Sequence, residues 1–178
     1  MESLAELDRV CQKPQHRTVG TWMACHMTRQ QALAVTWLLL HTPVTANQVT
    51  VASIAAGIAA GAGYAGAARP WAFLAGALAH QLFYLLDHVD GQIARYRQTV
   101  SVTGLYLDYM AHYLVNASTV FGLGLGAFFQ TRRLVFLYFA LSGTVFVTLW
   151  GVFYDCRYKA FMKELVARAR GAVWIHKS

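Results

Sequence analysis

The chain has 178 residues, of which 57% are hydrophobic and only 13% are charged. An ordinary soluble domain carries about twice that share of charge, so this composition indicates an integral membrane protein. The formal net charge of +7 does not indicate nucleic-acid binding, because the basic residues lie at the ends of apolar segments. Three scattered cysteines without CxxC spacing argue against a disulfide framework or a zinc site.

The N-terminal region, residues 1–41, is mixed in character and carries no cleavable signal pattern. Leu4, Leu7 and Val10 recur at helical spacing, which predicts an amphipathic helix at the membrane interface, broken at Pro14. The alternative is a disordered tail over residues 1–16. Residues 31–40 are apolar but about half the length of a span. They are expected to end the interfacial helix, with a buried re-entrant piece as the competing interpretation.

Four longer apolar segments follow, and each is long enough to cross a bilayer. They cover residues 47–68, 71–95, 105–129 and 134–154. Thr45 precedes the first segment and can cap its helix. Small residues in the first segment favour close helix packing. The predicted fold is therefore all-α: a polytopic membrane helix bundle of about four transmembrane helices, with interfacial amphipathic helices at both ends.

Residues 156–178 are basic and amphipathic, which predicts an interfacial helix on anionic lipid after a core of residues 42–155. Positive charge also gathers in the N-terminal region and at Arg95 and Arg97. These three basic stretches are expected to face the cytoplasm, outweighing the opposing pair Arg132 and Arg133.

Three carboxylates interrupt the apolar core: Asp87, Asp90 and Asp108. A carboxylate inside lipid costs roughly 2.5–3.5 kcal/mol on the insertion scale, so three of them require compensation. Asp87 and Asp90 share one helical face, as do Asp108 and His112 further on. A helical hairpin would bring both pairs to one membrane surface around a bound cation, and Arg95 alone cannot balance three acids.

The spacing of these residues resembles the motif of the CDP-alcohol phosphotransferase family, D-x2-D-G-x2-A-R-x8-G-x3-D-x3-D. Seven of its eight fixed positions match, and only His112 departs, where the family has its last aspartate. The matching residues are Asp87, Asp90, Gly91, Ala94, Arg95, Gly104 and Asp108. Members of the family have six spans, and this chain has sequence for four of them.

The resemblance implies a transferase of phospholipid biosynthesis. Such an enzyme moves a substituted phosphate group from a CDP-alcohol, here expected to be CDP-diacylglycerol, to an acceptor hydroxyl with release of CMP. It implies that Mg²⁺ or Mn²⁺ is held by the three aspartates. Gly91, Ala94, Arg95 and Gly104 are then expected to bind the nucleotide or its phosphates. Asn47 and Thr50 occupy the place of a family motif that opens the first span, and either cap the helix or contact the nucleotide.

His112 replaces the aspartate that the family uses as general base. Imidazole is a competent general base but a poor ligand for Mg²⁺. The hypothesis is that His112 accepts the proton of the acceptor. The alternatives are an impaired member that binds nucleotide or metal, a small non-enzymatic carrier, and a scaffold that dimerises through its glycine-rich spans. The expected partners are donor, acceptor, membrane lipid and a second copy of the chain, with no nucleic acid.

Overall fold

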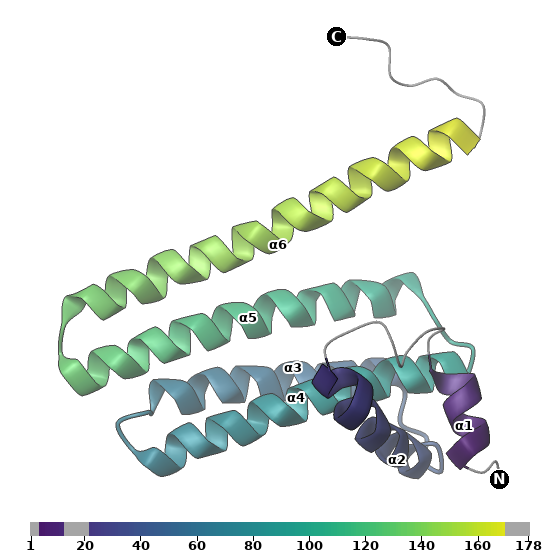
Figure 1. The fold of residues 1–178 in the computed structure, drawn as a ribbon, viewed down its shortest axis with the longest axis horizontal. Coiled ribbons are helices and arrows are strands. Elements are labelled where there is room, and N and C mark those ends of the chain that lie inside the picture. Colours follow the sequence, from purple (N-terminus) through teal and green to yellow (C-terminus); the bar gives the residue numbers. More distant parts are fainter. Residues whose placement is uncertain (1–3, 13–21, 170–178) are drawn as a thin grey trace.

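The computed structural model of the chain describes residues 4–12 and 22–169. Within those ranges it contains six α-helices and one short π-helix, which confirms the all-α prediction. The elements are α1 (Leu4–Cys11), η1 (Ala24–Thr28), α2 (Arg29–Leu39), α3 (Ala46–Ala65), α4 (Pro70–Tyr96), α5 (Val102–Thr131) and α6 (Leu134–Ala169). Helices α3 to α6 run up and down with short connections, and α1 and α2 lie at one end of this bundle (Figure 1).

The helix boundaries follow local capping chemistry. Thr45 caps α3 as predicted: its hydroxyl accepts the Gln48 N–H, and the Gln48 side chain accepts the Thr45 N–H at 2.9 Å. Ser101 caps α5 by accepting the N–H of Gly104 at 3.1 Å. Gly104 therefore belongs to the first turn of α5, just before the start of the span predicted from residue 105. Both caps lie at the end of the bundle that carries the acidic motif.

Helices α3 and α5 approach each other through glycine. A Cβ added at Gly57 would lie 2.1 Å from a methyl group of Val115, and one added at Gly61 would lie 2.5 Å from the carbonyl oxygen of Ser118. Gly122 approaches the Gly61 backbone in the same way. The predicted close packing of the glycine-rich spans is confirmed. These glycines pack within one chain, so they do not offer the surface through which a scaffold was expected to dimerise.

Helix α6 differs from the prediction, because it continues through the boundary expected at residue 155. The sequence after Gly151 holds no glycine or proline up to Ala169, and it is rich in good helix formers. The onset of charge therefore does not end the helix, and the separate interfacial helix expected from residue 156 is not formed over the described residues. Helix α6 is also highly exposed along its apolar stretch.

Among the described residues, two helices are long and apolar enough to cross a membrane: Ala46–Ala65 and Leu134–Arg168. The spans predicted at residues 71–95 and 105–129 correspond to α4 and α5, which have 27 and 30 residues but do not belong to this pair, so two of the four predicted spans are supported. Helices α4 and α5 carry the polar motif at the ends where they are joined to each other.

The N-terminal region packs against the bundle. On α1, Leu7 and Cys11 are buried against Leu33 of α2. On α2, Ala32 joins a core cluster with Val89 of α4. The alternative of a disordered tail is therefore wrong for residues 4–12, and the break expected at Pro14 lies outside the described residues. The result is a helical cover over the end of α4.

Candidate functional site

A cavity of about 380 Å³ lies where α3 begins, α4 ends and α5 begins. All ten residues that the sequence singled out line this cavity: Asn47, Thr50, Asp87, Asp90, Gly91, Ala94, Arg95, Gly104, Asp108 and His112. The connection between α4 and α5 is short, so it folds the two halves of the motif back onto each other. The structure thus brings together every predicted site residue, and their individual roles remain predictions.

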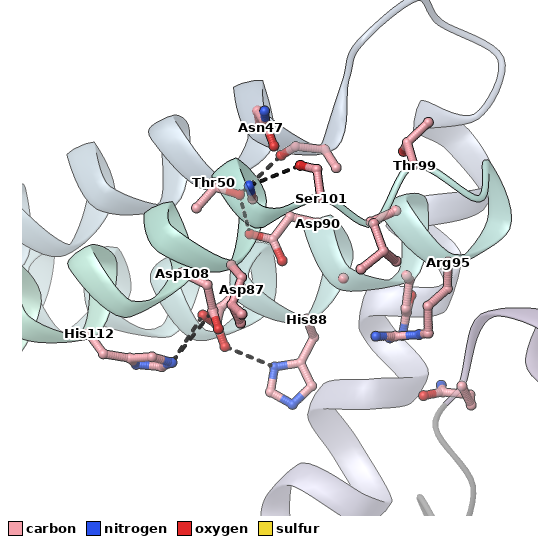
Figure 2. A pocket seen from close by; sticks show the side chains of 18 of the residues that line it. Asn47, Thr50, Asp87, His88, Asp90, Arg95, Thr99, Ser101, Asp108 and His112 are labelled. Atoms are coloured by element: carbon pink, nitrogen blue, oxygen red, sulfur yellow. Dashed lines mark hydrogen bonds and ion pairs between the residues drawn. The ribbon is translucent and has the colours of Figure 1, made fainter. Parts of the chain in front are cut away.

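Asp87, Asp108 and His112 form the tightest group in the cavity. The Nε2 atom of His112 lies 3.6 Å from Oδ1 of Asp87 and 3.7 Å from Oδ1 of Asp108. One ligand atom from each residue lies within 4.8 Å of the others, so the group could hold a metal ion. Figure 2 shows the three side chains converging from two neighbouring helices. The donor set of two carboxylates and one imidazole fits Mn²⁺ well, and Mg²⁺ less well.

Asp90 lies beside this group in the same cavity, and its role as a metal ligand stays a prediction. Its side chain is buried, and Oδ2 accepts a hydrogen bond of 2.6 Å from the hydroxyl of Thr50. Thr50 is itself only 4% exposed. A hydrogen bond to a buried carboxylate fixes the orientation of that carboxylate, so Thr50 orients Asp90. From the sequence, Thr50 was expected either to cap the helix or to contact the nucleotide.

The imidazole of His112 is half-exposed and faces the cavity. The ring of the buried Phe83 lies 6.0 Å away in an edge-to-face arrangement, which restricts the orientation of the imidazole. His88, which was not singled out from the sequence, lines the same cavity, and its Nδ1 lies 3.9 Å from Oδ2 of Asp87. The cavity therefore spans more of the α4 surface than one helical face.

At two places on the cavity wall, glycine lets a neighbouring side chain lie close to the backbone. A Cβ at Gly91 would lie 3.1 Å from Nη1 of Arg95, and a Cβ at Gly104 would lie 3.3 Å from the side-chain oxygen of Asn47. The guanidinium group of Arg95 therefore lies directly over Gly91. Its Nε donates to the carbonyl oxygen of Cys11 in α1, a partner that the sequence did not predict.

Sequence reasoning missed several residues that line the cavity, including Gln12, Arg29 and Gln92. Gln12 and Arg29 belong to the N-terminal region, which carries no motif to mark them. Gln92 lies inside the motif at one of its variable positions. Its side chain is 1% exposed in the structure. The sequence signal that could have identified it is its place between Asp90 and Arg95, where a buried polar side chain needs hydrogen-bond partners.

These features define a helical protein with a polar, metal-competent cavity at one end of its bundle. Comparison with protein families matches the CDP-alcohol phosphatidyltransferase model over residues 43–175, well over half of the chain. The chain therefore belongs to the CDP-alcohol phosphatidyltransferase family. A search of curated proteins finds no significant match. The family match confirms the resemblance drawn from the motif, and it extends past residue 155 along α6.

Proposed function

We propose that the chain is an integral membrane transferase that moves a substituted phosphate group from a CDP-alcohol to an acceptor hydroxyl and releases CMP. The observation that carries this proposal is the convergence of all ten motif-derived residues on one cavity. Family membership supports the class of reaction. The donor we expect is CDP-diacylglycerol, which places the reaction in phospholipid biosynthesis.

The exposed surface of α6 supports location in a membrane. Its most apolar stretch is only 6% buried, and contiguous apolar surface of that extent is rare on soluble monomers. The turn after Arg97 and the basic end of α6 lie at the cavity end of the bundle, so the positive-inside rule supports a cytoplasmic cavity. A homodimer stays part of the proposal, formed through surfaces other than the α3–α5 glycines.

Asp87 and Asp108, with Asp90 beside them, are the residues that would hold Mg²⁺ or Mn²⁺. A bound divalent ion would neutralise charge on the phosphate oxygens during transfer. Gly91, Ala94 and Gly104 line the wall of the cavity against which the nucleotide would lie, with Arg95 placed over Gly91 to meet its phosphates.

His112 is proposed to accept the proton of the acceptor hydroxyl. The acceptor oxygen forms a new bond to the β-phosphorus, and the bond from that phosphorus to the oxygen of CMP breaks. The carboxylates of Asp87 and Asp108, less than 4 Å from Nε2, would stabilise the imidazolium that results. The edge-to-face contact with the buried Phe83 would help to orient the imidazole for this transfer.

A second candidate is an impaired family member that binds nucleotide or metal without turnover. The observation in its favour is that His112 is one of the three groups that could hold the ion. A ring nitrogen that binds a cation cannot accept a proton, so the two roles of His112 exclude each other at Nε2. A non-enzymatic carrier is less well supported, because the acids lie at helix ends rather than at mid-span.

The test measures CMP release by the purified full chain in detergent and lipid. CDP-diacylglycerol is supplied with a panel of acceptors and either Mn²⁺ or Mg²⁺. We expect turnover by the wild type, loss of at least 10²-fold in His112→Ala, and retention in His112→Asp, since an aspartate restores the family's base. A silent wild type with turnover gained in His112→Asp would refute the histidine-base role and support the impaired member. Silence of both proteins with every acceptor would refute the transferase.

A further inference from the structure

The cavity has a second, basic end that is built partly by the N-terminal region. Gln12, at the end of α1, and Arg29, at the start of α2, line this end. Both residues precede residue 43, where the match to the family begins. The N-terminal helices therefore add contacts that the family motif does not encode.

Hydrogen bonds fix this addition to the bundle. The side-chain amide of Gln92 in α4 donates to the carbonyl oxygen of Arg29 at 3.3 Å, and Gln12 donates to the same oxygen at 3.5 Å. The buried Gln92 also accepts a hydrogen bond of 2.7 Å from the Thr36 hydroxyl of α2. These bonds fix the backbone of Arg29 relative to the motif helix, and its guanidinium group donates from Nη1 to Sγ of Cys25 at 3.5 Å.

Arg95 completes the basic end. Its Nε is bonded to the carbonyl oxygen of Cys11, while Nη1 and Nη2 lie over Gly91, where a Cβ would be 3.1 and 3.5 Å away. The guanidinium group of Arg95 lies close enough to interact electrostatically with the Asp90 carboxylate and with Arg29. In Figure 2, Arg95 and His112 lie at opposite sides of the group of labelled residues, and Asp90 lies between them. Asp87, Asp108 and His112 therefore lie toward one end of the cavity and the guanidinium groups toward the other.

We propose that Arg29 and Arg95 form an anion subsite that binds a phosphate group carried by the acceptor, so that the acceptor is a phosphorylated alcohol. This inference rests on the proposed transferase function. The diphosphate of the donor belongs at the carboxylate end, where cations would compensate its charge. A second phosphate group requires a separate positive site, and the planar forks of two arginines suit phosphate geometry.

The same two guanidinium groups could instead meet the diphosphate of the donor. The ligands in the test distinguish a site for the acceptor's phosphate from a site for the donor's diphosphate. The full chain in detergent is titrated calorimetrically with glycerol 3-phosphate, with inorganic phosphate, with glycerol, and with CDP plus Mn²⁺. The variants are Arg29→Gln and Arg29→Lys. Arg69→Gln serves as the matched control, because Arg69 is an exposed arginine before α4 at the other end of the bundle.

We expect wild type and Arg69→Gln to bind both phosphate ligands at least tenfold more tightly than glycerol. Arg29→Gln should lose this preference and weaken phosphate binding about tenfold, whereas CDP binding should weaken less than threefold. Arg29→Lys keeps the charge without the fork and should lie between the two. Retained CDP binding by Arg29→Gln shows that this variant is folded.

Unchanged phosphate binding in Arg29→Gln, or no phosphate binding by the wild type, would overturn the subsite. A loss confined to CDP would also overturn it, because the arginines would then serve the donor. If phosphate binds as expected but neither the wild type nor any variant binds CDP, the proposed transferase fails while the anion site stands. The two failures are therefore distinguishable.

Discussion

Replacing Gly122 by alanine tests the packing that positions the site from a distance. A Cβ at this position would lie 2.1 Å from the carbonyl oxygen of Gly61 and 3.0 Å from its Cα. Both contacts are to backbone, so no side chain can rotate away. Since 3.0 Å is about the closest approach that a Cβ makes, α3 and α5 would have to separate by about 0.9 Å.

Overpacking of a close interface costs about 1–3 kcal/mol. For a chain of this size each kcal/mol lowers the melting temperature by about 2–4 °C, so we expect Gly122→Ala to melt several degrees below the wild type. The separation would also reach the cavity, because α3 carries Thr50 and α5 carries Asp108. A displacement of about 1 Å at reacting groups can reduce the rate about 10²-fold.

The assay is thermal unfolding of the full chain in detergent, followed by CMP release at a temperature where both proteins are folded. Gly143→Ala in α6 is the matched control, because its Cβ would meet only a methyl group of Val120, at 3.0 Å, which can move. We expect the control to melt within about 2 °C of the wild type. Equal melting of Gly122→Ala and wild type would refute the backbone contact between α3 and α5.

Three further predictions concern the site and its supports. Thr50→Val removes the hydrogen bond to Asp90 while keeping the side-chain shape, and should weaken Mn²⁺ binding about 10–100-fold by electron paramagnetic titration, with Thr50→Ser near wild type. Arg97→Gln removes two charged hydrogen bonds, of 2.6 Å to the Val44 carbonyl oxygen and 2.8 Å to the Thr42 carbonyl oxygen, and should cost at least about 1.5–3 kcal/mol in chemical unfolding, which unchanged unfolding would contradict. His112→Ala should leave the affinity for Mn²⁺ nearly unchanged in titration, because a base that accepts a proton at Nε2 does not bind the ion there; a marked loss of affinity would make His112 a ligand and contradict the base role.

The sequence predicted the parts of the site that depend on spacing along one helix or across one short turn. Asp87 and Asp108 meet because each lies a fixed number of residues from the same turn. Thr45 caps α3 because its hydroxyl needs only a partner three residues away. Local geometry decides such features, and local sequence contains the necessary information.

The remainder depends on contacts between distant segments. Nothing in the sequence near Cys11 indicates that it contacts Arg95, which lies 84 residues further along the chain. The same holds for Arg29 and its partner Gln92, 63 residues away. The helix end expected near residue 155 is not observed, because α6 continues to Ala169. The expectation was based on the change from apolar to charged side chains that begins at Asp155. Backbone hydrogen bonding continues regardless of side-chain charge until a residue such as glycine or proline interrupts it.

The continuous α6 has a consequence for the supply of donor. Its 36 residues extend about 54 Å at 1.5 Å per residue, whereas the hydrocarbon of a bilayer is about 30 Å thick. In the proposed membrane location, much of the C-terminal part, which carries Arg157, Lys159, Lys163 and Arg168, would therefore stand in the headgroup layer or beyond it. This basic part lies at the end of the bundle where α5 begins, since the Tyr113 hydroxyl of α5 donates to Asp155. Negatively charged lipids are enriched around such a basic helix, so the proposed lipid donor would be concentrated in the leaflet beside the cavity before it binds.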